Sequence, residues 1–141
     1  RAYRYLNVFF DKFIRKNTLY GESGPCFETP MSALASFTEM LLSGKDGVIK
    51  IMPAVPEKWK DIKFERLLAE KGFEVSAERT DGTVKRVFVK SLYGGSCKIY
   101  PGIEKEVCKI KLSGQAKVKS SDENGFELIM PRGGTAEISR K

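Results

Sequence analysis

The sequence of 141 residues contains no histidine. Chemistry that needs imidazole, such as Ser–His and Cys–His nucleophile pairs or histidine-ligated metal sites, is therefore excluded for these residues. Cysteine is also scarce. The three cysteines, at positions 26, 97 and 108, lack the CxxC spacing of zinc and redox motifs. We expect Cys97 and Cys108 to be packed thiols rather than a disulfide, and we expect no metal or other cofactor.

Long apolar runs are missing as well. The longest contain three or four residues, such as 8–10 and 40–42, whereas roughly 20 are needed to cross a bilayer. We therefore expect no membrane partner. No signal-peptide pattern opens the chain, and its first residue is Arg1, so we expect it to be cut from a longer protein. The composition, 41% hydrophobic and 30% charged, is that of a globular protein.

The net charge is +7, and lysines gather between residues 98 and 119. Their spacing argues against a nucleic-acid surface. Lysines alternate with apolar residues over 107–112 and again over 116–119, which is typical of strands with one buried and one solvated face. No aromatic residues lie among these lysines to stack on bases. The pattern therefore predicts a solvated sheet face and no nucleic-acid partner.

The first 43 residues favour two helices. Apolar residues recur every three or four positions over 3–16, which predicts an amphipathic helix. A second helix should begin with Thr29 as N-cap and Pro30 in its first turn, and should end near Gly44. The connection over 17–28 contains Gly and Pro breakers, and long irregular loops of this kind often carry function.

Residues from about 47 onward favour short strands joined by turns. Alternation over 73–78, the Asp81–Gly82 hairpin signal and the return strand over 84–92 are the clearest features. Trp59 is expected to pack between elements. About eight strands with regularly spaced turns predict an antiparallel β-sandwich. The further strands are expected at 48–52, 62–69, 97–100, 106–112, 115–119, 126–130 and 135–139. Within 62–69, residues 66–69 alone are also compatible with a helix.

The helical half and the β half differ in how completely they can bury their apolar residues. The β part has enough strands to close its own core, but two helices cannot fully cover the four phenylalanines that they present. Either the helices lie on the sandwich or their partners belong to another part of the protein. The phenylalanines are Phe9, Phe10, Phe13 and Phe37.

Four segments carry a resemblance to a known family. They read GPCFETP at 24–30, TEMLL at 38–42, DGVIKIMPAVPEKW at 46–59 and GFEVSA at 72–77. Together they resemble the C-terminal end of glycoside hydrolase family 95, which contains α-L-fucosidases and α-L-galactosidases. The resemblance covers about half of the chain, and the last 45 or so residues match only in their β character.

The resemblance implies an α+β architecture: two N-terminal helices forming the tail of an (α/α)6 barrel, followed by an antiparallel β-sandwich. Residues 1–45 would be the last helices of the catalytic barrel, and 46–141 the C-terminal sandwich. The upstream barrel would then be the main partner of this chain. The resemblance also implies a periplasmic or secreted parent that acts on an oligosaccharide.

The family hydrolyses terminal α-L-fucose or α-L-galactose with inversion, which requires two carboxyl groups with room for a water molecule between them. The resemblance matches no residue of this chain to the family's general acid. It places the general base eleven residues before Glu39, at Glu28. The family has aspartate there, followed by Gly-Asn where this chain has Thr29-Pro30. The longer side chain shifts the carboxylate, and a misplacement of about 1 Å can cost ~100-fold in rate.

Other readings of these residues stay open. A glutamate at the start of a helix is also favoured by the helix dipole alone. Glu22 is a weaker candidate for substrate binding on the same loop. Tyr20, Phe27 and Trp59 are aromatic candidates for stacking on a sugar ring, although such residues are more often found in a core or an interface.

Two functions follow from the sequence. The first is a C-terminal fragment of an α-L-fucosidase-like hydrolase, inactive alone, whose sandwich supports the barrel. The alternative is a non-catalytic carbohydrate-binding module, for which a row of exposed tyrosines or tryptophans would be needed; the strands supply Tyr93 and Tyr100. In the isolated chain, we expect the helices to be mobile or to bury their apolar faces in a homodimer.

Overall fold

The computed structural model describes residues 1–16, 20–21 and 27–141. Two helices, α1 (Ala2–Phe13) and α2 (Glu28–Leu41), precede the strands, as the sequence predicts. Two short 3-10 turns, η1 (Glu70–Gly72) and η2 (Lys105–Val107), interrupt the β part. The strands are β1 (Leu42–Lys45), β2 (Val48–Ile51), β3 (Ile62–Ala69), β4 (Phe73–Thr80), β5 (Thr83–Ser91), β6 (Gly95–Tyr100), β7 (Cys108–Ser113), β8 (Lys117–Ser121), β9 (Phe126–Met130) and β10 (Thr135–Arg140).

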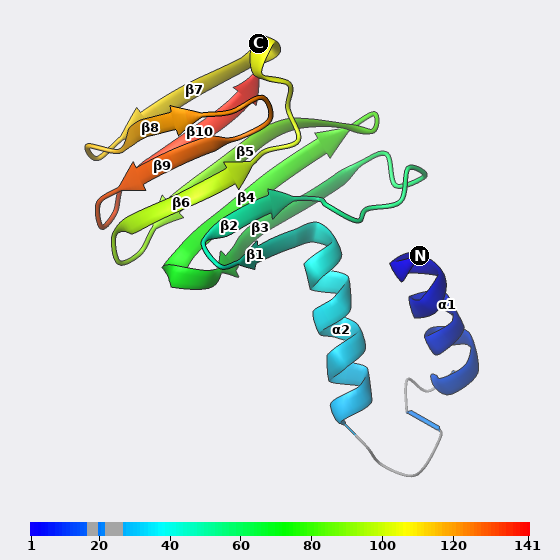
Figure 1. Cartoon of the computed structure of the whole chain (residues 1–141). Coiled ribbons are helices and arrows are strands. Elements are labelled where there is room, and N and C mark those ends of the chain that lie inside the picture. The colour runs from blue at the N-terminus through cyan, green and yellow to red at the C-terminus, as the bar shows by residue number, and fades with distance from the viewer. Residues whose placement is uncertain (17–19, 22–26) are drawn as a thin grey trace.

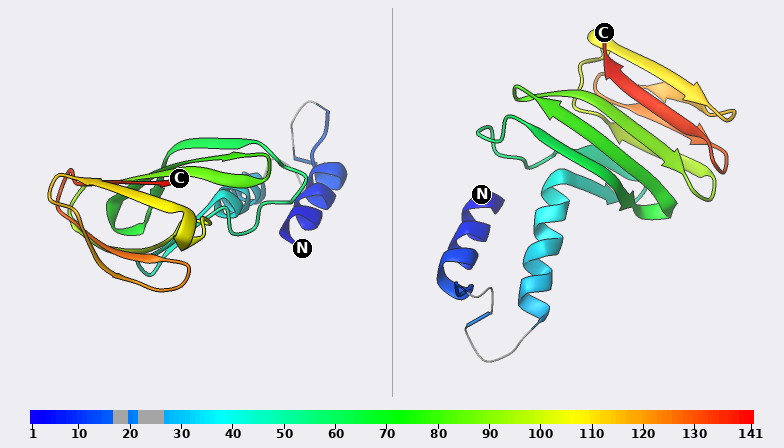
Figure 2. Two further views of the ribbon diagram at one scale, coloured as in Figure 1. Left: turned by 90° about the horizontal axis from the view of Figure 1, so that it is seen from above. Right: turned by 180° about the vertical axis from the view of Figure 1, so that it is seen from behind.

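The strands form two five-stranded sheets that pack face to face (Figures 1 and 2). One sheet has the order β1-β2-β6-β9-β8, and the other has the order β3-β4-β5-β10-β7. The α+β fold, with two helices followed by a β-sandwich, is therefore confirmed. One pair departs from the antiparallel pattern, because β2 and β6 run parallel, with Ile49 opposite Ile99.

The core lies between the two sheets. Strand residues of alternating position point inward, and many of them are fully buried. This cluster is continuous from β1 to β10, so the sandwich closes its own core. Its most buried members are Ile49, Phe73, Val75, Val87, Val89, Ile99, Leu128, Met130, Ala136 and Ile138.

The helices do not cover either sheet. They lie side by side and project from one end of the sandwich, and α2 runs directly into β1 (Figures 1 and 2). A separate small cluster holds them, with Leu6, Ala33 and Met40 as its buried members. Trp59 packs at the centre, with ring centroids 5.4 Å from Tyr3 and 5.7 Å from Phe37. The prediction that Trp59 packs between elements is confirmed.

The predicted helix ends are wrong at several positions. The first helix ends at Phe13 rather than residue 16. The N-cap of α2 is Phe27, so Thr29 lies inside the first turn. Gly44 does not end α2. The backbone N–H of Met52 donates to the Leu41 carbonyl at 2.8 Å, which satisfies the helix terminus without a glycine cap.

Gly44 instead lies in β1, opposite Ile49. A Cβ atom at this position would meet the Ala69 Cβ at 2.4 Å. The glycine therefore permits the close approach of β1, at the edge of one sheet, to β3, at the edge of the other. Its function is packing between strands rather than ending the helix.

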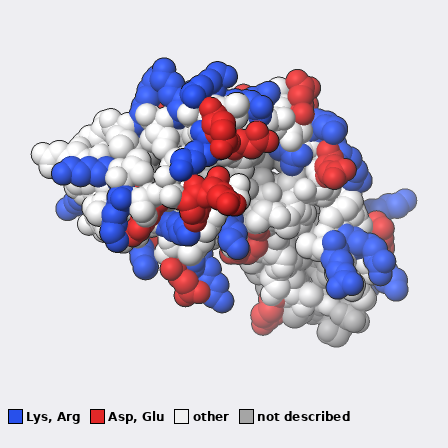
Figure 3. All heavy atoms as spheres, turned by 45° about the horizontal axis from the view of Figure 1, so that its top comes forward, with Lys and Arg blue, Asp and Glu red and all other residues white. Residues whose placement is uncertain are grey.

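The lysines of β7 lie on its solvated side, as their spacing predicts. Lys109 and Lys111 are exposed, while Cys108 and Ile110 between them are half-buried. In the edge strand β8, lysines also alternate with other residues in the sequence, but neither face of the strand is buried, because every residue is exposed. Figure 3 shows Lys and Arg interspersed with Asp and Glu on the face in view.

Candidate functional site

Three of the four residues singled out from the loop over 17–28 lie in the described part of the chain. Tyr20, Phe27 and Glu28 are placed at the end of the helix pair away from the sandwich (Figure 1). Glu22 lies outside the described residues, as does Cys26. The structure thus brings the candidate base, Glu28, and two aromatic candidates to the same end of the helix pair.

Glu28 is the first residue of α2, and its side chain is exposed. It is the acidic residue of the first turn, where the partial positive charge of the helix favours a carboxylate. Phe27 precedes it as N-cap and is 75% exposed. An exposed phenylalanine beside a carboxylate is suitable for contact with a ligand or with a neighbouring domain.

Tyr20 packs on α1. Its ring is stacked on Phe9, with centroids 6.0 Å apart and planes inclined by 22°, and it also contacts the Phe13 ring at 6.2 Å. The Gly21 backbone N–H donates to the Phe13 carbonyl at 2.8 Å, which fixes this part of the loop on the helix end. Tyr20 therefore has a clear packing role, and its ring is only partly accessible for stacking on a sugar.

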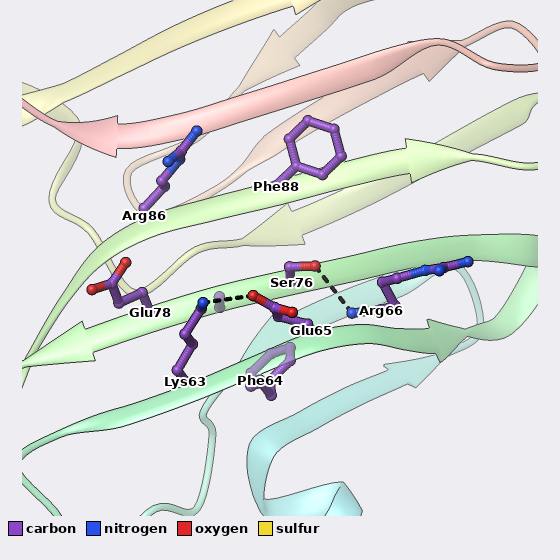
Figure 4. Close-up of a pocket in the computed structure, with 9 residues that line it drawn as sticks. Lys63, Phe64, Glu65, Arg66, Ser76, Glu78, Arg86 and Phe88 are labelled. Carbon is purple, nitrogen blue, oxygen red and sulfur yellow. Dashed lines mark hydrogen bonds and ion pairs between the residues drawn. The ribbon is translucent and has the colours of Figure 1, made fainter.

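A different site, on the sandwich, escaped the sequence reasoning. A hollow of about 280 Å³ lies on the outer face of β3, β4 and β5 (Figure 4). We call it the β3–β5 hollow. Its lining residues are Lys63, Phe64, Glu65, Arg66, Ser76, Ala77, Glu78, Arg86 and Phe88.

A bulge in β3 shapes this hollow. The register between β3 and β4 shifts between Phe64 and Leu67, and Arg66 has a left-handed φ of 58°. This conformation is uncommon for a residue with a side chain. Two contacts to β4 hold it: the Arg66 backbone N–H donates to Ser76 Oγ at 3.0 Å, and Arg66 Nε lies 3.0 Å from Glu74 Oε2.

The cations of the β3–β5 hollow are paired within the protein. Lys63 Nζ lies 2.6 Å from Glu65 Oε1, and Arg86 Nε lies 3.0 Å from Glu137 Oε1. The hydrogen bond between Lys63 and Glu65 raises the pKa of the lysine and lowers the pKa of the glutamate. Lys63, Glu65 and Arg86 are exposed and Glu137 is half-buried, so the pairs contribute little to stability, but they fix the local charge balance.

One signal in the sequence could have identified this surface. Val87 and Val89 are fully buried, so the residues between and beside them face outward. Phe88 is then a large apolar residue on the outer face, where it stands opposite Ser76 and Glu137. The bulge at Arg66, in contrast, depends on pairing with β4 and carries no local sequence signal.

Two other site types can be reported for the described residues. In the described part of the chain, no group of three or more Asp, Glu or Cys side chains is placed to hold a metal ion. No helix formed by residues 1–16, 20–21 and 27–141 has the length and apolar character needed to span a membrane.

Comparison with known proteins concerns the sandwich. The family model described as "Glycoside hydrolase family 95, C-terminal domain" matches residues 43–138. The match begins inside β1 and ends inside β10, so it covers both sheets and leaves out the helix pair. A search of the curated proteins found no match for the chain. The chain belongs to glycoside hydrolase family 95, and its sandwich is the C-terminal domain of that family.

Proposed function

We propose that this chain is the C-terminal part of an α-L-fucosidase-like glycoside hydrolase, and that its sandwich supports an (α/α)6 catalytic barrel. Residues 1–45 would contribute the last helices of that barrel, and residues 46–141 the appended sandwich. The observation that carries the proposal is the helix pair, which is built for helical neighbours but has few in the described chain.

Both helices expose large apolar side chains among their polar ones. Tyr5 of α1 is 63% exposed, and Met31 and Leu34 of α2 are 62% and 59% exposed. Val8 and Phe10 of α1 are also exposed. Exposed apolar side chains that gather on one element typically mark an interface, and upstream barrel helices would cover them as they cover the helices of a bundle.

The connection to the sandwich is suited to a supporting role. α2 continues into β1 without a linker, and the Met52 backbone N–H donates to the Leu41 carbonyl at the junction. Trp59, from the segment that follows β2, packs against rings of both helices. The helices and the sandwich are thus joined by backbone continuity and by side-chain packing, which favours a steadying function over an independently mobile module.

We assign Glu28 the role of general base in the intact enzyme, drawing a proton from the attacking water. Inverting hydrolysis needs a second carboxyl group as general acid, and one carboxylate cannot donate and abstract the two protons at once. The acid would come from the upstream barrel. The isolated chain should therefore be inactive. We place the action of the intact parent on its oligosaccharide outside the cytoplasm.

The test uses the intact parent enzyme. Glu28→Gln should reduce kcat for an aryl α-L-fucoside by at least about 10³-fold while leaving KM nearly unchanged, because the amide cannot accept the proton. Glu28→Asp should keep measurable activity, since it restores the carboxylate found in the family. The matched control is Glu39→Gln, which neutralises another exposed glutamate of the same helix.

Two results would contradict the proposal. Turnover of the fucoside by residues 1–141 alone would show that no upstream acid is needed. If Glu28→Gln and Glu39→Gln reduced kcat equally and only slightly, Glu28 would be a helix-end carboxylate with no part in the chemistry.

The alternative function, a carbohydrate-binding module with a row of exposed aromatics, receives less support. Tyr93 is 77% exposed but lies in the turn after β5, whereas Tyr100 ends β6 in the other sheet. The two tyrosines therefore do not form one row on one face.

A further inference from the structure

We propose that the β3–β5 hollow binds one ring of a neutral sugar, as a subsite separate from the catalytic centre of the parent enzyme. The inference goes beyond the proposed function, since it does not depend on Glu28 or on the barrel. It rests on the chemistry of the lining residues, on their charge balance and on the size of the hollow.

Phe88 provides an apolar platform. It points away from the core because its neighbours Val87 and Val89 are fully buried on the other side of β5. In the sheet it stands opposite Ser76 of β4 and Glu137 of β10. Figure 4 shows its ring on the outer side of the sheet, next to Arg86. The C–H face of a pyranose is the apolar surface that packs well on such a ring.

Polar groups surround this platform in the arrangement that hydroxyl groups require. Ser76 Oγ accepts the Arg66 N–H, which leaves its own hydroxyl hydrogen to donate. Glu78 stands opposite Arg86 in the sheet register, so a carboxylate acceptor and a guanidinium donor, the latter paired with Glu137, both line the hollow. The hydroxyl groups of a sugar both donate and accept, and therefore can use either group.

The charge balance favours a neutral ligand. Three cations, Lys63, Arg66 and Arg86, each have a carboxylate partner within 3.0 Å. With Glu78 added, four carboxylates face three cations in and around the hollow. A phosphate or carboxylate ligand would have to displace an internal partner from a cation, whereas a neutral polyol would not.

The same charges argue against a protein partner on this face. The centre of a protein interface is depleted in charged residues. Here Phe88 lines the hollow together with Glu65, Glu78, Arg66 and Arg86, which a covering domain would have to desolvate. A small ligand with many hydroxyl groups can instead replace the water on these groups while using the single aromatic ring.

The size fits one sugar ring. A hollow of about 280 Å³ is slightly smaller than the roughly 300–1,000 Å³ usual for small-molecule sites, and it is open to solvent. One partly covered ring should bind weakly, with a Kd on the order of 1 mM.

The experiment is a titration of the full, ¹⁵N-labelled chain followed by ¹H–¹⁵N correlation spectra. The probes are L-fucose, D-galactose and D-glucose, each up to about 50 mM, with inorganic phosphate as the charged comparison. We expect saturable shifts for at least one sugar at the backbone amides of Arg66, Ser76 and Phe88. Phe88→Leu, which keeps apolar bulk but removes the flat ring, should raise Kd by at least about 10-fold.

The control variant is Tyr93→Ala, which removes an exposed ring outside the hollow and should leave Kd unchanged. If Phe88→Leu loses the dispersed spectrum of the folded chain, the exposed Glu78→Ala variant takes its place, and we expect about 5-fold weaker binding. The proposal is overturned if no sugar gives a saturable shift, if the Kd of the folded Phe88→Leu or Glu78→Ala variant equals that of the wild type, or if phosphate binds more tightly than every sugar.

The outcome is separable from that of the proposed function. Loss of sugar binding in Phe88→Leu would support the binding site in the hollow, and the role of Glu28 would still depend on its own test. Absence of binding to the hollow would leave the catalytic test of Glu28 unaffected.

Discussion

At the scale of single residues, Gly44 is the position where an added methyl group should be most disruptive in β1. Its Cβ would lie 2.4 Å from the Ala69 Cβ and 2.8 Å from the Ala69 Cα. Gly44→Ala should lower the free energy of unfolding by about 1–3 kcal/mol through overpacking. Urea unfolding followed by circular dichroism measures this, and Ser43→Ala on the same strand should change the midpoint little. Equal effects of the two variants would contradict the role of the glycine.

The thiol of Cys97 gives a prediction for pH. It is buried between the sheets, and this burial raises its pKa from 9.0 to about 11. Because the folded state holds the proton more tightly than the unfolded state, stability is retained below pH 9 and falls between about pH 9 and 11.

The measurement compares wild type with Cys97→Ala, both in a Cys26→Ser background. The difference in unfolding free energy between the two proteins should shrink by up to about 2 kcal/mol from pH 8 to pH 11. A difference that stays constant over this range would show that the thiol has the same pKa in both states. Half-buried Cys108 should react with a thiol reagent faster than Cys97 at every pH.

Residue-scale features were the least predictable from sequence. Thr29 and Gly44 have the residue types of helix caps, but the Leu41 carbonyl is satisfied by Met52, which lies beyond β2. Such long-range hydrogen bonds override local preferences. Glu28 was singled out by family resemblance and not by spacing, and the role of Phe88 required the pairing of three strands.

At the scale of elements, the packing of Trp59 should hold the helix pair against the segment that follows β2. It is the one tryptophan of the sequence, and it contacts Tyr3 of α1 and Phe37 of α2. Trp59→Ala should cost about 2 kcal/mol at this half-buried site. The loss should fall on the helices, so the amides of α1 should exchange faster while those of β4 and β5 stay protected.

Hydrogen exchange by mass spectrometry resolves these elements. Phe27→Ala is the control, since it removes a ring that is largely exposed and should leave the exchange of α1 unchanged. Uniform loss of protection across helices and sheets would mean that Trp59 stabilises the whole chain as one unit.

Helices and most strands were predictable because their periodicity is local. Apolar spacing located α1 and α2 within a few residues, and alternation located β4 and β5. The parallel pairing of β2 with β6 could not be read in this way, because it joins segments separated by three strands and by the turn before β6. A strand was predicted at 115–119, close to β8, but its exposure on both faces was not, since edge strands can alternate in sequence without being buried.

At the scale of the whole molecule, the isolated chain should self-associate through its helices. The exposed apolar residues of α2, Met31 and Leu34, lie on the surface that we assign to the barrel. Size-exclusion chromatography with light scattering should give a mass that rises with concentration. The double variant Met31→Glu, Leu34→Glu should be monomeric, because burying its carboxylates in an apolar contact is costly.

Leu68→Glu is the control for this prediction, since Leu68 is equally exposed but belongs to β3. It should associate like the wild type. A monomeric wild-type chain with fully protected amides over residues 3–16 would contradict the prediction, because the helix pair would then be stable without any further partner.

The direct passage from α2 into β1 has a mechanical consequence. No residue separates α2 from β1, and Trp59 packs against rings of both helices, so we expect the sandwich and the helix pair to move together. A tilt of α2 within a barrel would then be enlarged at the far edge of the sandwich, and a force on the sandwich would be transmitted along α2 to Glu28 at its other end. We therefore expect the position of the sandwich to affect the residue that we assign to the chemistry.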